Sequence, residues 1–277
     1  MPEGWEWDET LYKGAAAYYR RGRPPYPASM RERFEAATNL HGAPRLLDVG
    51  CGPGTVAVAL APLFTEVVGV DPDPDMLVEA ARLAAESGAT NARWVRLRAE
   101  DLPAGLGMFR YATFAQSFHW MDRDRVARVV FEMLEAGGAF VHVNTVVADP
   151  PPPPSLPFPT PPESEIDRLV RSYLGEARRA GRGVLAHGSP SGEPLVLARA
   201  GFRPVRVVRV RGRQILERDI EDIVAQVFSV SGSAPHLFGT DLAAFGVDLR
   251  RLLEQASDHG RFSQWLGDIQ LDIYERP

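Results

Sequence analysis

The stretch "LLDVGCGPGT" at residues 46–55 decides the fold, because it places a glycine-rich turn directly behind a short apolar run. Residues 45–49 read as a buried strand, and residues 55–64 read as a helix. A turn with so few side chains lets a ligand approach the backbone closely. Its glycines stand at 50, 52 and 54, whereas the dinucleotide pattern G-x-G-x-x-G requires glycine at 55, where the chain has Thr55. This register disfavours a nicotinamide cofactor.

A pair of aspartates points to a nucleoside-containing ligand. Asp48 stands just ahead of the glycine turn, and Asp71 ends the next apolar run, 23 residues later. Ligands of open parallel sheets bind beyond the carboxyl ends of the strands, where a carboxylate at this point accepts both ribose hydroxyls. Taken alone, the pair also fits a nicotinamide protein.

Strand and helix patterns alternate over the first half of the chain. Strands are expected at 45–49, 66–71, 92–99, 111–117 and 139–147, and helices at 28–40, 55–64, 74–88 and 124–138. Such alternation predicts right-handed crossovers and a sheet covered on both faces. With two closing strands at 203–213 and 268–276, the expected fold class is α/β, a doubly wound, mostly parallel, Rossmann-like sheet of seven strands.

The alternation stops at a proline-rich segment. Nine of the thirteen residues from Pro150 to Pro162 are proline, which predicts a stiff crossover out of the sheet. Helical patterns follow at 163–180, 191–200, 219–230 and 241–257. The expected organisation is an N-terminal cap or lid (1–44), a cofactor-binding core (45–149), a proline-rich crossover with a helical insertion (150–204), and closing strands and helices that complete the sheet and cap the substrate (205–277).

Composition excludes several classes of protein. No run approaches the ~20 apolar residues of a membrane span, and the acidic amino terminus "MPEGWEWDET" does not resemble a secretory signal. A single cysteine, Cys51, suits a cytoplasmic location and reads as a loop filler. A net charge of −5 argues against nucleic acid as a partner. The arginines and valines of 203–213 are interpreted as a strand with valines inward and solvated arginines, in preference to a nucleic-acid-binding stripe.

Five motifs in order resemble those of a known enzyme family. They are "LLDVGCGPGT", "VVGVDPDPDML", "RAEDLP", "TFAQSFHWMD" and "MLEAGGAFVHV", preceded by the leader "WDETLYKGAAAYYRRGRPPYP". The set is similar to the class I S-adenosylmethionine-dependent methyltransferases, in particular the small-molecule branch with trans-aconitate and ubiquinone/menaquinone methyltransferase-like proteins. The motifs cover 45–147. One departure is Arg110, where the family commonly has an aspartate, and another is the apolar stretch "DLPAGLGM" before it.

The resemblance implies S-adenosyl-L-methionine as cofactor, S-adenosyl-L-homocysteine as product and a small-molecule methyl acceptor. It implies that Asp48 and the three glycines surround the methionine part, that Asp71 binds the ribose, and that Gln116 lies under the sulfonium. The implied neighbours of the adenine are Pro72, Met76, Ala99, Glu100 and Asp101. The full set of expected cofactor-binding residues is Asp48, Gly50, Gly52, Gly54, Asp71, Pro72, Met76, Ala99, Glu100, Asp101, Gln116, Tyr19 and Arg23.

Catalytic candidates lie after the fourth strand and in the leader. His119 fits a general base for a hydroxyl, a hydrogen-bond donor to an acceptor carboxylate, or a histidine packed against the cap. Trp120 fits a wall of the pocket or a packing residue of the loop. Arg23 fits a clamp for the cofactor's carboxylate or for an acidic substrate, with Tyr18 and Tyr19 beside it in a lid that excludes water. The alternative is a leader that simply packs on the domain.

The functional prediction is therefore a small-molecule methyltransferase that favours oxygen acceptors. The histidines are scattered without metal-ligand spacing, so no metal site is expected. The tetrapeptide used for amino groups of bases, of the Asn-Pro-Pro-Tyr type, does not occur. Two alternatives stay open: an NAD(P)-dependent oxidoreductase, and a non-catalytic protein that binds S-adenosylmethionine for regulation.

Overall fold

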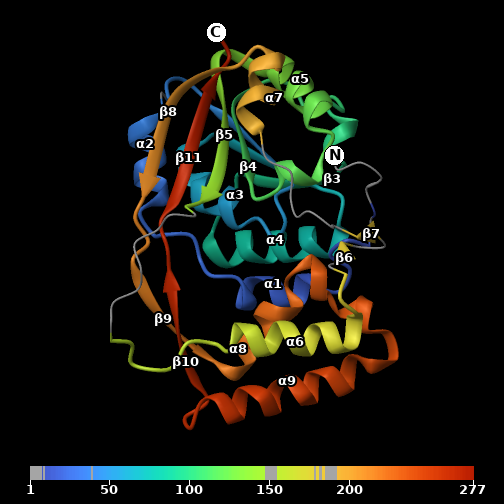
Figure 1. The fold of residues 1–277 in the computed structure, drawn as a ribbon. Helices are drawn as coiled ribbons and strands as arrows, with labels where there is room; N and C mark the ends of the chain where they lie inside the picture. Colours follow the sequence, from blue (N-terminus) through green and yellow to red (C-terminus); the bar gives the residue numbers. More distant parts are fainter. Residues whose placement is uncertain are drawn as a thin grey trace.

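A computed structural model describes residues 8, 10–38, 40–146, 155–177, 179–180, 183–184 and 192–277. It divides into an upright sheet with its covering helices and a helical layer at one end of that sheet (Figure 1). Among the described residues no helix combines the length and the apolar character needed to cross a membrane.

The central sheet has seven strands in the order β3-β2-β1-β4-β5-β11-β8. All neighbours from β3 to β5 run parallel, and β11 runs antiparallel to both β5 and β8. The expected doubly wound, mostly parallel seven-stranded sheet is thus confirmed. The strands are β1 (Arg45–Val49), β2 (Glu66–Asp71), β3 (Ala92–Arg96), β4 (Phe109–Ala115), β5 (Leu134–Thr145), β8 (Arg203–Val210) and β11 (Ile269–Glu275).

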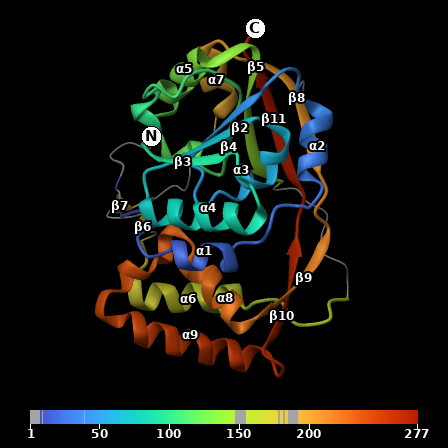
Figure 2. The same ribbon diagram turned by 180° about the vertical axis from the view of Figure 1, so that it is seen from behind.

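Helices cover both faces of this sheet. On one face, α2 (Met30–Ala37) and α3 (Thr55–Leu60) bury Phe34 and Leu60 against the strands. On the other, α5 (Arg123–Met133) and α7 (Glu193–Ala200) cover a cluster that includes Phe114 and Phe140, whose rings stack at 4.2 Å. The helix α4 (Pro74–Ser87) packs beside α3 and β3, and Figure 2 shows it crossing the end of the sheet. Short 3-10 turns are η1 (Ala61–Leu63), η2 (Ala99–Asp101) and η3 (Phe118–Trp120).

The helical layer lies beyond the carboxyl ends of the parallel strands (Figure 1). Its core stacks Phe238 on Phe245 at 4.1 Å, with Phe228 against both rings. Two antiparallel strands, β9 and β10, continue from β8 and lead into β11, so they link the layer to the sheet. The layer and its links consist of α1 (Ala16–Gly22), α6 (Glu163–Leu174), β6 (Arg179–Ala180), β7 (Gly183–Val184), β9 (Gln214–Asp219), α8 (Ile220–Phe228), η4 (Ser231–Ser233), η5 (Pro235–Asp241), α9 (Leu242–Ala256) and β10 (Arg261–Leu266).

The leader helix α1 is fixed to α8, about 200 residues further along the chain. A Cβ atom built on Gly22 would lie 2.3 Å from the Ala225 carbonyl oxygen, so only glycine permits this close approach. Arg218, which is 7% exposed, donates to the carbonyls of Arg21 at 2.7 Å and Gly22 at 3.1 Å. It thereby satisfies the open carboxyl end of α1.

Several expectations from the sequence are wrong in detail; the helix expected at 163–180, for example, ends at Leu174. The helix expected at 124–138 ends at Met133, and β5 begins at Leu134. The reason is a bulge: the β4–β5 register shifts between Phe109 and Tyr111, and a Cβ on Gly138 would lie 2.8 Å from the Arg110 carbonyl oxygen. Gly137 and Gly138 therefore serve the strand and do not end the helix.

The strands β9 and β10 were not expected, because "QILERD" and "RFSQWL" lack a clean apolar alternation. The interpretation of 203–213 holds only for Val208 and Val210, which are buried, whereas Val205 and Val207 are 53% and 66% exposed. Because successive side chains of a strand point to opposite faces, Val205 and Val207 lie on the face opposite to that of Val208 and Val210, and β8 is an edge strand on which that face stays exposed. Residues 150–154 of the proline-rich segment lie outside the described residues.

Candidate functional site

A pocket opens where the carboxyl ends of β1, β2 and β4 face the helical layer. Its empty space amounts to about 760 Å³, a figure that includes space open to solvent. Strand ends and loops form its floor, and the leader and η3 form its roof. The lining residues are Tyr12, Tyr19, Gly50, Gly52, Asp71, Pro72, Asp73, Met76, Leu97, Arg98, Ala99, Glu100, Ala115, Gln116, Ser117, Trp120 and Met121.

The glycines of the turn perform different tasks. Gly52 has a φ of 53° and nothing within 4 Å of the position of a Cβ, so it leaves the pocket open. Gly50 permits the close approach of Ser117, because a Cβ atom built on Gly50 would lie only 2.6 Å from the Ser117 Cβ. Gly54 does not line the pocket: a Cβ there would meet the Trp94 ring at 2.6 Å. The third glycine is thus required by helix–strand packing.

Asp71 is held in place by the turn itself. Its Oδ2 accepts a hydrogen bond from the Gly52 N–H at 2.9 Å, and its Oδ1 accepts one from the Asp73 N–H at 2.9 Å. Burial raises its pKa to about 6, and these two backbone bonds oppose the rise. A carboxylate oxygen offers two acceptor sites. Both oxygens therefore retain capacity for a ligand's hydroxyl groups.

Asp48 lies beneath the turn and does not line the pocket. It is 1% exposed, and its Oδ1 accepts a hydrogen bond from the Thr113 hydroxyl at 2.7 Å. Its Oδ2 is buried without a hydrogen-bond partner among the described residues. Burial raises its pKa to about 7, although Thr113 and the Ala57 backbone lower it. A buried carboxyl of this kind favours a nearby positive charge.

Gln116 marks the end of β4 with a strained backbone. Its φ is 54°, in the left-handed region that non-glycine residues rarely adopt. The strain costs of order 1 kcal/mol and persists where the surroundings impose it, which is common at functional sites. The next residue, Ser117, is anchored by its hydroxyl, which donates to the Val49 carbonyl at 2.6 Å. The Gln116 backbone is thereby held at the pocket's edge.

Three aromatic rings form the roof. Tyr12 meets Tyr19 edge-on at 6.2 Å and Trp120 edge-on at 6.3 Å. The Tyr12 hydroxyl also interacts with the side chains of Trp120 and Ser231, and burial raises its pKa. The leader is thus joined to η3 and to the helical layer above the pocket.

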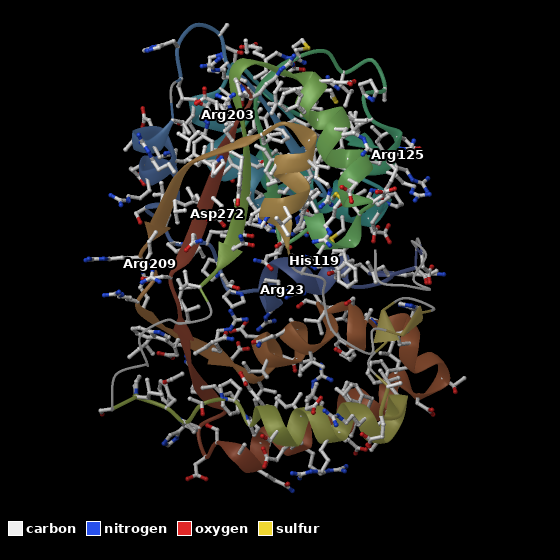
Figure 3. All side chains as sticks on the ribbon, turned by 45° about the horizontal axis from the view of Figure 1, so that its top comes forward. Arg23, His119, Arg125, Arg203, Arg209 and Asp272 are labelled. Atoms are coloured by element: carbon white, nitrogen blue, oxygen red, sulfur yellow. The ribbon has the colours of Figure 1, made fainter. Side chains whose placement is uncertain are left out.

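Arg23 lies beside the roof. Its guanidinium stands 5.0 Å from the centre of the Tyr19 ring, and its Nη2 donates to the Ser229 carbonyl at 2.9 Å. Its Nε is buried and has no partner among the described residues. Figure 3 shows Arg23 and His119 at the level where the sheet meets the helical layer. A buried donor without an acceptor favours an anionic ligand group.

The other expected residues divide into two groups. Pro72, Met76, Ala99 and Glu100 line the pocket, and so do Tyr19, Gln116 and Trp120. Those that do not line it are Asp48, Gly54, Asp101, Arg23, Tyr18 and His119. Tyr18 packs on Phe228 at 5.0 Å inside the helical layer, and the His119 ring lies 4.8 Å from that of Trp120.

Sequence reasoning missed seven lining residues. Six are neighbours of expected ones, so the same motifs would have found them had their flanks been included: Asp73, Leu97, Arg98, Ala115, Ser117 and Met121. The seventh, Tyr12, comes from the leader, where no spacing rule indicates which aromatic residue faces the pocket.

A family model described as "Methyltransferase domain" matches residues 46–138. The glycine turn, Asp71 and Gln116 fall inside this match. Residues 46–138 therefore form a methyltransferase domain of the kind that the resemblance implied. The topology agrees, since a mostly parallel seven-stranded sheet is what the resemblance implied.

Relatives of this methyltransferase domain include two curated proteins. The chain is 30% identical over 132 residues to the probable S-adenosylmethionine-dependent methyltransferase CRG1 of Saccharomyces cerevisiae, covering 45% of this chain and 43% of that protein. It is 32% identical over 108 residues to the uncharacterized methyltransferase YcgJ of Bacillus subtilis, covering 39% of this chain and 43% of that protein. The chain thus matches less than half the length of either relative.

Two solved structures share the fold. A putative methyltransferase from Bacillus halodurans is 18% identical with a TM-score of 0.51, covering 90% of this chain and 99% of that one. The [4+2]-cyclase SpnF is 20% identical with a TM-score of 0.51, covering 90% of this chain and 81% of that one. Because one of the two is named a cyclase, the fold alone does not define the reaction.

Proposed function

We propose that this chain transfers the methyl group of S-adenosylmethionine to a small molecule, with oxygen acceptors favoured. The observation that carries the proposal is the pocket at the strand ends, where the open space before Gly52 adjoins the carboxylate of Asp71. A carboxylate at a ribose diol and apolar walls around a purine are what an adenosine group requires.

The residues present fit the cofactor part by part. Asp71 would accept the ribose hydroxyls, and Pro72, Met76, Leu97 and Ala99 would form apolar walls for the adenine. Arg23 lies beside the roof, outside the pocket lining, and its side chain would have to turn toward the pocket for its buried Nε to meet the methionine carboxylate. When bound, S-adenosylmethionine supplies an electrophilic methyl group on a sulfonium, so the chain's own work is largely positioning.

The acceptor would enter on the side of Trp120 and the leader. The aromatic roof of Tyr12, Tyr19 and Trp120 would limit the access of water to the strand ends, and an acceptor enclosed beneath it would have to be a small molecule. His119, packed on Trp120, would take the proton of an acceptor hydroxyl or donate a hydrogen bond to an acceptor carboxylate. Tyr18, inside the helical layer, would support the roof from behind. A cytoplasmic location belongs to the same proposal.

Two alternative functions make different demands on the site. A nicotinamide oxidoreductase would need the glycine pattern that Thr55 interrupts. A regulatory protein would bind S-adenosylmethionine through the same turn and would not turn it over.

The test is transfer of labelled methyl from S-adenosylmethionine to a panel of small phenols, aliphatic hydroxyls, carboxylates and amines. We expect labelled methyl ethers or esters, and His119→Asn is expected to lower kcat about 100-fold while binding of S-adenosylhomocysteine stays unchanged. His259→Asn, at an exposed histidine, is the matched control. Labelled amines only would contradict the acceptor class. Tight cofactor binding without any labelled product would favour the regulatory alternative.

A further inference from the structure

A groove rich in arginine runs between α2 and the edge strand β8. Figure 3 shows Arg209 at this outer edge of the sheet, away from His119 and the pocket. One arginine comes from α2 and the others from β8 and the turn after it. The groove is lined by Arg33, Ala36, Ala37, Arg206, Val207, Val208, Arg209, Arg211 and Arg213. Five cations thus face one hollow in a chain of net charge −5.

Most of this charge is not neutralised by neighbours. Among the described residues, Arg33, Arg206 and Arg211 have no carboxylate within ion-pair distance, whereas Arg209 and Arg213 share the buried Asp268 at 4.0 Å and 3.3 Å. The acidic residues of α2, Glu32 and Glu35, are exposed and do not line the groove. Five positive charges therefore meet one negative charge at the groove.

The turn that presents two of these arginines is fixed in a strained shape. Arg213 has a φ of 49°, and a Cβ on Gly212 would lie 2.0 Å from the Gly267 carbonyl oxygen. The Asp268 carboxylate, whose side chain is 0% exposed, accepts from the Gly212 N–H at 3.1 Å and from Arg213. Strained backbone conformations that the surroundings impose are common at functional sites. Because the turn is already fixed, binding a ligand there would cost less conformational entropy.

We propose that this groove binds a compact polyphosphate anion, that is, a diphosphate or triphosphate group, free or carried by a nucleotide. A guanidinium group can donate two parallel hydrogen bonds to the oxygens of one phosphate. Several guanidinium groups around one groove can therefore bind several closely spaced phosphates. Of the described residues that line the groove, none is aromatic. Single-stranded nucleic acid needs stacking surfaces, and the overall negative charge repels a long polyanion. The site is separate from the proposed methyl-transfer pocket, so it does not depend on that function.

The experiment is calorimetry with inorganic tripolyphosphate at low ionic strength, on the full chain. The test variant is Arg33→Ala with Arg211→Ala, two exposed side chains without a carboxylate partner among the described residues. The matched control is Arg203→Ala, an exposed arginine on the same strand that lies outside the groove. Saturable binding is expected for the wild type and for the control, with affinity lowered about 100-fold in the double variant. Added salt should weaken the wild-type binding.

Parallel titrations with ADP and with a DNA duplex identify the source of the anion. Loss of ADP affinity in the double variant that exceeds the loss for tripolyphosphate would assign the groove to a nucleotide, and an equal loss would assign it to the phosphate chain alone. Either result supports the proposal. An absence of saturable tripolyphosphate binding, an affinity unchanged in the double variant, or tighter binding of the duplex would overturn it. Unchanged thermal unfolding of both variants excludes a folding defect.

Discussion

The floor and the roof of the pocket are built in opposite ways. The floor consists of strand ends and tight turns, and its contacts, such as Asp71 with Gly52, join residues close in sequence or on neighbouring strands. The roof comes from the leader, and it is held by contacts about 200 residues away, such as that of Arg218 with Arg21. Its donors are arginines, and its acceptors are backbone carbonyls together with the carboxylates of Glu86, Asp219 and Asp222.

The difference has an electrostatic consequence. The floor holds two carboxyls with raised pKa values, Asp48 and Asp71, so it loses stability when they ionise. The roof depends on guanidinium groups, which stay charged at every pH of interest. A cationic ligand would therefore stabilise the floor. The roof, whose arginines also pair with Asp222 and Glu86, would lose stability only at acidic pH, where these carboxylates take up protons, because the arginines lower their pKa values. Each prediction below separates the two.

The largest effect is expected from Asp48 and concerns the floor. A pKa of about 7 in place of 3.8 means that the native state binds the proton more tightly than the unfolded chain. Protonated Asp48 therefore stabilises the fold fully at low pH, below the pKa of 3.8 that the side chain has in the unfolded chain. As pH rises through about 7, this contribution to the free energy of unfolding, up to about 4 kcal/mol, is lost. Asp48→Asn should flatten this part of the profile in urea unfolding followed over pH. Asp101→Asn, at an exposed residue, should leave the profile as it is; an unchanged profile in Asp48→Asn would contradict the buried carboxyl.

The next effect concerns the roof. Arg218→Ala leaves the carbonyls of Arg21 and Gly22 without their buried donor, at a cost of about 3 kcal/mol in the free energy of unfolding. The loss should not change between neutral and high pH, in contrast to that of Asp48, and should become smaller only at acidic pH, where Asp222, the ion-pair partner of Arg218, takes up a proton. Arg199→Ala, which breaks an exposed pair with Asp124, should cost less than about 1 kcal/mol. Equal losses for the two arginine variants would show that the leader is not fixed by Arg218.

Cofactor affinity tests the floor directly. Asp71→Asn keeps the shape of the side chain and removes its charge, and binding of S-adenosylhomocysteine should weaken about 10- to 100-fold. Wild-type affinity should rise with pH through about 6, as the Asp71 carboxyl ionises, and this rise should shrink in the variant. The control Asp101→Asn should bind as the wild type does, since Asp101 does not line the pocket. A matched loss in Asp101→Asn would restore its expected role at the adenine edge.

The smallest effect is a test of close packing in the roof. Gly22→Ala places a methyl group 2.3 Å from the Ala225 carbonyl oxygen, so α1 must move away from α8, at a cost of about 1–3 kcal/mol. In Gly246→Ala the new methyl group would meet only the flexible end of Arg250 at 3.2 Å, and the helix should gain slightly. Thermal unfolding of the two variants measures the difference. Identical unfolding would mean that α1 and α8 do not pack as described.

Sequence reasoning predicted the floor better than the roof, for physical reasons. Local signals define the floor: the glycine turn, Asp71 at a strand end, and the proline that starts α4 all act within a few residues. The roof depends on which distant surfaces meet, and no periodicity shows that Tyr12 faces the pocket while Tyr18 packs on Phe228. The roles of the site residues themselves remain predictions.

Errors within the sheet have the same origin. A glycine pair after an amphipathic run usually ends a helix, yet Gly137 and Gly138 accommodate a bulge between β4 and β5, a feature set by the neighbouring strand. The strands β9 and β10 pair with each other where the helical layer joins the sheet, and their own residues carry little strand signal, so their pairing depends on a partner that is distant in sequence.

The most direct test of the account is calorimetry with S-adenosylmethionine, S-adenosylhomocysteine, NAD and NADP side by side on the wild-type chain. The account predicts saturable binding of both sulfur ligands and none of either nicotinamide cofactor, since the open space before Gly52 and the carboxylate of Asp71 would receive an adenosine with a short cationic tail. Binding of a nicotinamide cofactor alone would contradict it.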